Sequence, residues 1–358
     1  MMDPLIPYNN LPLIPPEKLL ETPKVLKKAI SANRELAELK GAGPLIPNQS
    51  VLIQTLGLQE AKISSEIENI VTTNDELYRA FANLDAKTDP HTKEVLSYEK
   101  ALWYGYEAIL KKNRLFSATL FEEISQIVSK QNAGIRKLPG MQLKSPFGEV
   151  IYTPPSGEEM IREKLDNLVY FIYEEKSLDP LVKLALVHYQ FEAIHPFYDG
   201  NGRTGRILNI LFLLNEGLLD LPLLYLSKYI IENKNDYYIN LRKVTFENDW
   251  ELWILYMLEC VEKMANMTRK KVFSIDVLFN KTSEILKRDL PKIYSKDLVE
   301  ILFKHPYCKI KFLEEIGIHR ETASKYLQQI TRLGLLVSMQ KGREKYFINA
   351  LFLDLLTM

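Results

Sequence analysis

The sequence IHPFYDGNGRTGR occupies residues 194–206 and joins two segments with helical periodicity. Apolar residues recur at helical spacing from Leu184 to Ile194, and Pro196 is expected to end that helix near His195. A second helix is expected over about Arg203 to Glu216. This part of the chain is therefore predicted to be a helix-loop-helix whose loop is rich in polar residues and glycine.

The loop carries groups suited to a phosphate ligand. Gly200 and Gly202 flank Asn201 directly before a helix, so backbone amides can converge there and the helix N-terminus adds positive potential. Arg203 and Arg206 are three residues apart on one helical face, so both can reach the same polyphosphate. The sequence therefore predicts an anion-binding loop.

Two other side chains of the loop indicate catalysis. His195 is held by the proline after it and is suited to act as a base near neutral pH. Asp199 supplies a hard oxygen ligand for Mg²⁺ or Mn²⁺. An ordinary helix-loop-helix with a core histidine is the alternative, but base, metal ligand, anion-binding loop and arginines within about a dozen residues favour an active site.

Helical periodicity on both sides of this loop makes the predicted fold mainly α. Helices are expected through Ile67 and over residues 25–40, 93–112, 117–130, 235–244 and 250–267. Glycines and prolines interrupt this pattern over residues 134–155, where Ser145-Pro146-Phe147-Gly148 is typical of the turn of a short β-hairpin.

The C-terminal residues predict a separate small module. Three short helices (296–303, 310–316 and 320–334) precede two strands (335–339 and 345–349), the order of a winged helix-turn-helix. Residues 291–358 hold 11 Lys plus Arg against 7 Asp plus Glu, so the module is only mildly basic. Contact with DNA phosphates and contact with protein both stay open. The basic side chains concerned are Arg320, Lys325, Arg332, Lys341, Arg343 and Lys345.

Composition limits the class of protein. The chain has 358 residues, 46% of them hydrophobic and 26% charged, which predicts two or three globular domains. Its formal net charge of zero argues against a globally basic nucleic-acid coat. Cys260 and Cys308 lie far apart, so neither a disulfide framework nor a zinc site is indicated. We see no secretory signal and no uninterrupted apolar span, and we expect a cytoplasmic protein without membrane contact.

The run from His195 to Arg206 resembles the signature of Fic proteins, His-Pro-Phe-x-[Asp/Glu]-Gly-Asn-Gly-Arg-x-x-Arg, at every defined position. Most characterised members transfer AMP from ATP to a hydroxyl side chain of a target protein and release pyrophosphate. The resemblance implies a Fic-fold helical bundle with a short β-hairpin flap. It divides the chain into an N-terminal Fic-associated region with an inhibitory helix (1–95), a catalytic core (96–270) and the winged helix-turn-helix (285–358).

The resemblance also implies roles for single residues. His195 would deprotonate a Ser, Thr or Tyr hydroxyl of the target, and Asp199 would hold the metal ion. Arg203 would neutralise charge on the way to the transition state, and Arg206 would take the γ-phosphate. The implied nucleotide-binding set is Glu68, His195, Gly200, Asn201, Gly202, Arg203, Thr204, Gly205, Arg206, Tyr237 and Tyr238. For the two adjacent tyrosines, packing is the alternative interpretation.

A hairpin over residues 145–152 corresponds to the flap of the family. The edge of that flap pairs with the backbone of the target, which is β-augmentation. The docking residues implied here are Gly148, Glu149, Val150 and Ile151. A plain surface hairpin is the alternative.

Residues 64–69, Ser-Ser-Glu-Ile-Glu-Asn, resemble the inhibitory pattern of the family, [Ser/Thr]-x-x-x-Glu-[Gly/Asn]. Ser64, Glu68 and Asn69 take its fixed positions. Ser64 and Glu68 are four residues apart on one helical face, so both can point into the same cleft. The resemblance implies that Glu68 pairs with Arg206 and occupies the γ-phosphate site.

We therefore expect an autoinhibited protein adenylyltransferase that uses ATP with Mg²⁺ or Mn²⁺. Two alternatives stay open: an enzyme in which Glu68 also helps to remove AMP from the target, and a DNA-binding regulator whose Fic domain senses nucleotides. The identity of the target, self-modification and a homodimer stay open too.

Overall fold

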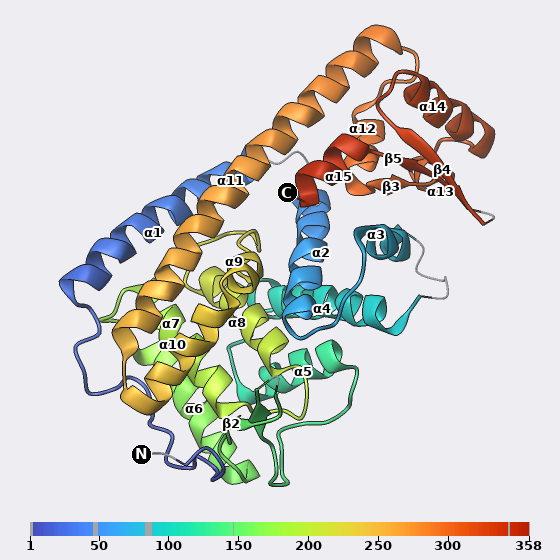
Figure 1. Cartoon of the computed structure of the whole chain (residues 1–358). Helices are drawn as coiled ribbons and strands as arrows, with labels where there is room; N and C mark the ends of the chain where they lie inside the picture. The colour runs from blue at the N-terminus through green and yellow to red at the C-terminus, as the bar shows by residue number, and fades with distance from the viewer. Residues whose placement is uncertain (1–2, 46–48, 83–87, 146, 343, 358) are drawn as a thin grey trace.

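The structure is a computed structural model and describes residues 3–45, 49–82, 88–145, 147–342 and 344–357. It consists mainly of helices, with one two-stranded and one three-stranded sheet in the described part (Figure 1). The predicted mainly α fold is confirmed. Among these described residues, every helix is too short or too polar to cross a membrane.

The helices are α1 (Pro23–Ala42), η1 (Gly43–Leu45), α2 (Gln49–Ile67), α3 (Asn74–Ala82), α4 (Pro90–Tyr106), η2 (Glu107–Lys111), α5 (Ala118–Ser129), α6 (Glu158–Glu174), α7 (Pro180–Ile194), α8 (Asn201–Asn215), α9 (Ser227–Glu232), α10 (Lys234–Glu247), α11 (Trp250–Asp289), α12 (Lys296–Lys304), α13 (Ile310–Glu314), α14 (Arg320–Arg332) and α15 (Ala350–Thr357). The strands are β1 (Leu143–Lys144), β2 (Val150–Tyr152), β3 (Tyr307–Cys308), β4 (Val337–Lys341) and β5 (Glu344–Ile348).

Helices α7 and α8 form the centre of the molecule. All residues of α7 except Pro180 and Glu192 are buried, which explains why its sequence is apolar on every face. Asp179 caps the helix by accepting hydrogen bonds from the amides of Leu181 (2.8 Å) and Val182 (3.4 Å), and Pro180 occupies the first turn. The loop between α7 and α8 is thereby held by two helices that are fixed in the core.

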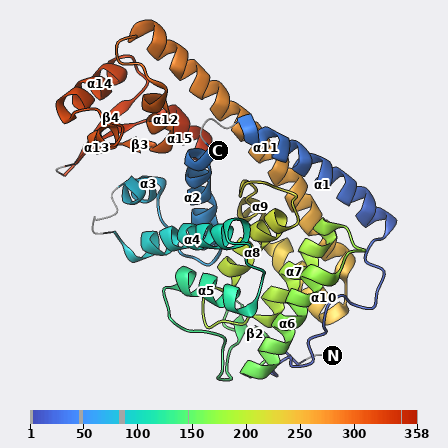
Figure 2. The ribbon, with the colours of Figure 1, turned by 180° about the vertical axis from the view of Figure 1, so that it is seen from behind.

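Helix α11 is longer than the sequence analysis predicts. We expected it to end at Met267, but it continues to Asp289 because no glycine or proline occurs before Pro291. Its first part packs along α1, and its second part reaches the C-terminal segment (Figures 1 and 2). The predicted division at residues 270–285 falls inside this continuous helix, and the domain boundaries stay a prediction.

The C-terminal segment has the order of helices and strands that we predicted. Strand β3 was not predicted, and it adds a third strand to an antiparallel sheet in the order β3-β5-β4. The segment contacts α2 and α3: the rings of Tyr307 and Tyr78 stack with centroids 6.3 Å apart, and Lys341 forms an ion pair with Asp75 (3.6 Å). Arg343 of the predicted wing lies outside the described residues.

Candidate active site

His195 is the residue that ends α7. Its backbone is left-handed (φ 48°), and its N–H donates to the carbonyl of Phe191 (3.0 Å). Pro196 cannot continue the helix, so the chain turns here, as the sequence predicts. The turn places the imidazole at the junction of α7 and the loop.

The imidazole of His195 is neutral at pH 7. Burial, helped by the positive charge of Arg136, lowers its pKa to about 4, although the carbonyl of Glu192 and the charge of Glu68 act in the opposite direction. A neutral imidazole can accept a proton, which is the state that a general base requires.

Arg136 is a residue of the site that sequence reasoning missed. It is 1% exposed, and its guanidinium donates to the carbonyl oxygens of His195 (2.7 Å) and Pro155 (2.8 Å). It therefore joins the end of α7 to the segment that follows strand β2. No local motif marks it, because its partners lie 59 and 19 residues away along the chain.

The loop closes on the side chain of Asn201. Its Oδ1 accepts from the amide of Phe197 and its Nδ2 donates to the carbonyl of the same residue, both at 2.8 Å. Gly200 precedes α8 with φ 74°, a conformation that favours glycine. A side chain on Gly202 would meet Glu68 Oε1 at 2.6 Å, so any larger residue would displace the Glu68 carboxylate. The predicted residues of the anion-binding loop are thus brought together at the N-terminus of α8.

Thr204 and Gly205 lie deeper than the predicted nucleotide-binding role implies. Thr204 is 1% exposed and donates its amide to the carbonyl of Gly200 (2.9 Å). A side chain on Gly205 would meet Glu192 Oε1 at 2.4 Å and a ring carbon of Phe191 at 3.2 Å. Gly205 therefore allows close packing of α8 on α7.

Both arginines of the loop bind the carboxylate of Glu68. Oε1 of Glu68 accepts from Arg206 Nη2, and Oε2 accepts from Arg203 Nε, both at 2.8 Å. Ser64 adds two contacts, from Arg206 Nε to its hydroxyl (2.7 Å) and from Arg206 Nη2 to its carbonyl (2.9 Å). We call these four residues the Glu68 clamp. We expected Glu68 to pair with Arg206 and to lie opposite the charge of both arginines; the direct hydrogen bond from Arg203 is an addition to that expectation.

Charge in the Glu68 clamp is set by the arginines. Burial alone would raise the pKa of Glu68, but the positive charges of Arg206 and Arg203 and their hydrogen bonds lower it overall. The pKa of Arg206 is lowered by burial and raised, on balance, by Glu68 and Glu192. The clamp therefore consists of a carboxylate between two guanidinium groups, which are 1% and 3% exposed.

Asn69, the third residue of the inhibitory pattern, ends α2. It is exposed and left-handed (φ 65°), and its N–H donates to the carbonyl of Glu66 (3.0 Å). Asparagine tolerates this conformation better than most residues. Its position shows a role in ending the helix that carries Ser64 and Glu68.

Arg203 has two further carboxylate partners. Its Nη1 lies 3.3 Å from Glu94 Oε2, and its Nη2 lies 3.2 Å from Asp199 Oδ1. Glu94, on α4, was missed because it lies 109 residues before Arg203 and belongs to no motif. Asp199 Oδ1 also accepts from the amide of Gly200 (2.7 Å).

The residues present fit a magnesium ion held mainly by a substrate. The side chain of Asp199 is 47% exposed, so it can offer a carboxylate oxygen while the ion keeps water ligands. Within the described ranges, no group of three or more His, Cys, Asp or Glu side chains could hold a metal ion. Phosphate oxygens would therefore have to complete the coordination.

The two tyrosines proposed for adenine occupy different environments. Tyr237 is 2% exposed, and its hydroxyl lies 2.9 Å from His188 Nε2 in the core. Tyr238 is 41% exposed and meets the ring of Tyr237 edge-on at 5.2 Å. The packing alternative describes Tyr237, whereas Tyr238 is free to contact a base.

The predicted flap forms a hairpin from β1 and β2. Ser145 N–H donates to the carbonyl of Glu149 (2.8 Å), and Gly148 is left-handed (φ 86°). Gly148 and Glu149 are exposed, and Val150 and Ile151 are half-buried. Tyr152 hydroxyl donates to the carbonyl of Ala193 (2.7 Å), two residues before His195. The flap is thus attached to the end of α7, and its Pro146 lies outside the described residues.

Glu192 is a third residue that the sequence analysis did not single out. Burial raises its pKa to about 7, while Arg206 lowers it and Glu68 raises it. Its Oε1 is buried and has no hydrogen-bond partner among the residues that the structure describes. The cleft therefore holds a second carboxyl group beside Arg206.

Three models of protein families match consecutive parts of the chain. The model described as Fic/DOC family N-terminal matches residues 26–107, Fic/DOC family matches residues 114–213, and Protein adenylyltransferase SoFic-like, C-terminal domain matches residues 278–352. Together they account for most of the chain, including the Glu68 clamp and the loop.

Curated relatives are similar over shorter stretches. A probable protein adenylyltransferase of Aquifex aeolicus (strain VF5) is 38% identical over 84 residues, which is 24% of this chain and 26% of the relative. The protein adenylyltransferase fic-1 of Caenorhabditis elegans is 36% identical over 92 residues, which is 25% of this chain and 17% of that protein. The matches span well under half of the length of either relative.

A solved structure shares the fold across nearly the whole chain. The crystal structure of a Fic family protein from Desulfovibrio desulfuricans G20 superposes with a TM-score of 0.56 at 18% identity, covering 92% of this chain and 96% of that one. The signature loop, the helices that hold it and the three consecutive family matches lead to one assignment: the chain belongs to the Fic/DOC family.

Proposed function

We propose that the chain is a protein adenylyltransferase held in an inhibited state by Glu68. The observation that carries this proposal is the Glu68 clamp: a carboxylate occupies a site formed by two buried arginines beside a neutral histidine. A site that binds a carboxylate with two guanidinium groups is suited to the oxygens of a phosphate chain.

The proposed reaction gives each of these groups a role. His195 accepts the proton of a Ser, Thr or Tyr hydroxyl as its oxygen attacks the α-phosphorus of ATP. The new oxygen–phosphorus bond forms while the bond from the α-phosphorus to the bridging oxygen breaks, and pyrophosphate leaves. Amides at the N-terminus of α8 and the guanidinium of Arg203 stabilise the negative charge on the phosphate oxygens.

A magnesium ion would be held by Asp199 together with phosphate oxygens. When bound, it would neutralise charge on the α- and β-phosphates. Asp199 is kept in place for this role by the amide of Gly200 and by Arg203.

Inhibition follows from competition for the two arginines. The γ-phosphate of ATP would need the guanidinium of Arg206, which now binds Ser64 and Glu68. ATP that enters beside Glu68 must shift its phosphates, and its α-phosphorus is then misaligned for attack. Release of Glu68 would make both arginines available to the phosphates of ATP and would restore the alignment of the α-phosphorus for attack.

The flap supports a protein as the second substrate. In the described sheet β2 pairs only with β1, so its other edge is available to an extended segment of a target. The exposed Gly148 and Glu149 lie in the turn of this hairpin.

Intact-mass spectrometry tests the proposal. The Glu68→Gly variant is incubated with Mg²⁺ and ATP, GTP, UTP or CTP, and a gain equal to one AMP, seen with ATP only, is expected on the protein or an added target. His195→Ala in the Glu68→Gly background should lower the rate by about 10²- to 10⁴-fold. Glu66→Gly is the matched control, because it introduces the same glycine into α2 at a partly exposed position outside the clamp. Equal labelling of Glu66→Gly and Glu68→Gly would contradict inhibition by Glu68.

Removal of AMP by the same site is the related candidate. Glu68 is ionised and lies beside the anion-binding loop, so it can orient a water molecule toward a bound phosphate. Release of AMP from a pre-modified protein, lost in Glu68→Gly and kept in Glu66→Gly, would support this activity.

The exposed face of α14 supports nucleic acid as a further partner. We propose that the C-terminal module is a winged helix-turn-helix, with Arg320, Lys325 and Arg332 exposed on α14. Binding of the full chain to duplex DNA that weakens steeply with salt is the expected result. Absence of binding at low salt would leave protein contact as the role of this face.

A further inference from the structure

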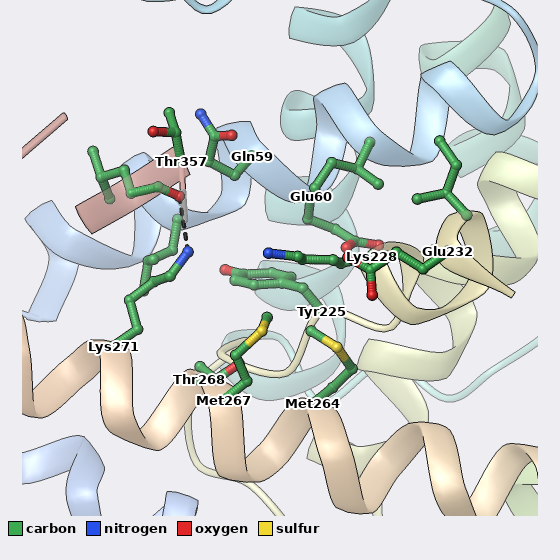
Figure 3. Close-up of a pocket in the computed structure, with 14 residues that line it drawn as sticks. Gln59, Glu60, Tyr225, Lys228, Glu232, Met264, Met267, Thr268, Lys271 and Thr357 are labelled. Carbon is green, nitrogen blue, oxygen red and sulfur yellow. Dashed lines mark hydrogen bonds between the residues drawn. The ribbon is translucent and has the colours of Figure 1, made fainter. Parts of the chain in front are cut away.

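A cavity lies against the part of α2 that precedes the Glu68 clamp. Its volume is about 180 Å³, and it is bounded by α2, α9, α11 and the C-terminal helix α15 (Figure 3). Leu56, Gln59, Glu60 and Ile63 form the α2 wall. These residues are the two turns of α2 directly before Ser64 and Glu68, so any occupant would rest on the helix that carries the clamp.

Most of the cavity wall is apolar and adaptable. Met264 and Met267 of α11 face Leu56 and Ile63 of α2 across the space, as Figure 3 illustrates for the two methionines. Methionine side chains adjust to irregular ligands more readily than branched ones. A cavity of about 150 Å³ is known to accommodate a molecule of the size of benzene, so this one has room for a small organic ligand.

Charged side chains lie at two ends of the cavity, Lys271 at one end and Lys228, Glu60 and Glu232 at the other (Figure 3). The ammonium group of Lys271 donates one hydrogen bond, to the carbonyl of Leu356 (2.8 Å), which Figure 3 marks as a dashed line. Burial and the nearby positive charge of Lys228 lower its pKa to about 8, so it is still mostly protonated at pH 7. No acidic side chain among the described residues forms an ion pair with it. A half-buried ammonium group that forms no such ion pair at its end of the cavity can bind an anionic group.

We propose that this cavity binds a small monocarboxylate with an apolar body of about six carbon atoms. The carboxylate lies at Lys271, and the apolar body lies between the methionines and α2. Because the cavity is complete when α2 is in its clamped position, a ligand that fits it stabilises that position. The ligand is therefore a negative effector. This second half of the inference rests on the proposed inhibition by Glu68, whereas binding itself does not.

Calorimetry with hexanoate tests the site. The full chain at pH 7 should bind hexanoate with a dissociation constant of about 1 mM, the affinity expected for a ligand of this size. Lys271→Met should weaken binding at least tenfold, and Lys271→Arg should keep it. Lys270→Met is the matched control, because Lys270 is exposed next to Lys271 and does not line the cavity. Absence of saturable binding, equal binding of hexylamine, or full binding by Lys271→Met would each overturn the site.

Hydrogen exchange tests the link to α2 without relying on catalysis. Hexanoate should slow amide exchange over residues 53–67 of the wild type by about threefold or more and leave Lys271→Met unchanged. If binding is seen without added protection of α2, the link is wrong.

Labelling by ATP then tests the regulatory effect. Saturating hexanoate should lower the labelling rate of the wild type about threefold and leave Glu68→Gly unaffected, since that variant has no clamp to stabilise. Equal slowing of both proteins would overturn regulation through α2. Failure of Glu68→Gly to label at all would instead contradict the proposed function, and the calorimetry and exchange results would still decide the site.

Discussion

Glu60 lies on α2 and Glu68 directly follows its last residue, and the pKa values of their carboxyl groups are shifted in opposite directions. Glu68 meets two guanidinium groups, which lower its pKa. Glu60 is 2% exposed, and burial raises its pKa to about 7, although the charge of Arg206 and hydrogen bonds from the amide and hydroxyl of Ser227 and the hydroxyl of Tyr98 act in the opposite direction. The same residue type thus forms a charged contact directly after α2 and, within α2, a contact that is mostly neutral below pH 7.

The difference shows how α2 combines a releasable contact with a permanent one. An ion pair with buried arginines can be replaced by another anion, such as a phosphate, without leaving the arginines unpaired. A neutral buried carboxyl that bonds to hydroxyl and amide groups offers no such exchange. We therefore expect the contacts of Glu68 to be exchanged during the functional cycle and the hydrogen bonds of Glu60 to be kept.

Loss of the charged contact should have the largest effect on stability. Glu68→Ala leaves Arg203 and Arg206 buried with less countercharge, which is expected to lower the free energy of unfolding by about 3 kcal/mol. Urea unfolding at pH 6 measures this free energy. Glu60→Gln exchanges one neutral hydrogen-bonding group for another and should change stability by less than about 1 kcal/mol. Equal losses in the two variants would show that the two carboxyl groups do not differ as described.

The rate of AMP transfer should also differ between variants of Glu68 and Glu60. Glu68→Gly is expected to raise the rate of AMP transfer by about 5- to 150-fold, the usual range for a coupling of this kind. Glu60→Gln should stay within about twofold of the wild type, because it leaves the clamp intact. Autoradiography with α-³²P-ATP gives both rates. Activation of Glu60→Gln to the level of Glu68→Gly would mean that the whole helix, and not its last turn, is what inhibits.

The pH dependence of stability should identify Glu60 as the neutral partner. Its pKa is about 7 in the folded protein and near 4.5 in the unfolded chain, so the folded state binds more protons between these values. Its contribution to stability is therefore fully present below pH 4.5 and is lost as pH rises toward 7. Between pH 5 and 7 the wild type should lose about 2 kcal/mol relative to Glu60→Gln. Parallel stability curves for the two proteins would contradict the raised pKa.

A conservative change in Arg206 should have a smaller effect. In the Glu68→Gly background, Arg206→Lys keeps the charge and loses the paired hydrogen bonds, so KM for ATP should rise about tenfold with little change in kcat. Steady-state labelling at varied ATP concentration measures both constants. An unchanged KM would remove Arg206 from the γ-phosphate site.

The sequence analysis succeeded where the chemistry is local. All groups of the loop lie within residues 194–206, and Ser64 and Glu68 lie one turn apart on a single helix, so spacing alone brought each set together. The sequence analysis failed where contacts join residues that are far apart in the sequence. Arg136, Glu94 and Glu192 take part in the site through tertiary packing, and no residue near any of them in sequence indicates its partner.

The predicted ends of helices and strands were likewise correct only where a local residue determines them. The end of α7 could be predicted because Pro196 forbids its continuation. The end of α11 was predicted too early at Met267, although Val272, Ile275, Phe279 and Leu286 continue the apolar spacing and are buried in the longer helix. The pairing of β3 with β5 joins residues 39 and 41 positions apart, and the two-residue strand β3 has no periodicity to detect.

The left-handed backbone of His195 lowers the stability of the fold at a residue that AMP transfer needs. A non-glycine residue in this conformation costs about 1 kcal/mol relative to glycine, and α7 would be capped equally well by glycine at this position. His195→Gly is therefore expected to unfold at a slightly higher temperature in a thermal scan while losing AMP transfer. Selection of variants for thermal stability alone would therefore replace His195 by glycine. If His195 is kept in a library selected for stability, selection for catalytic activity must have acted as well.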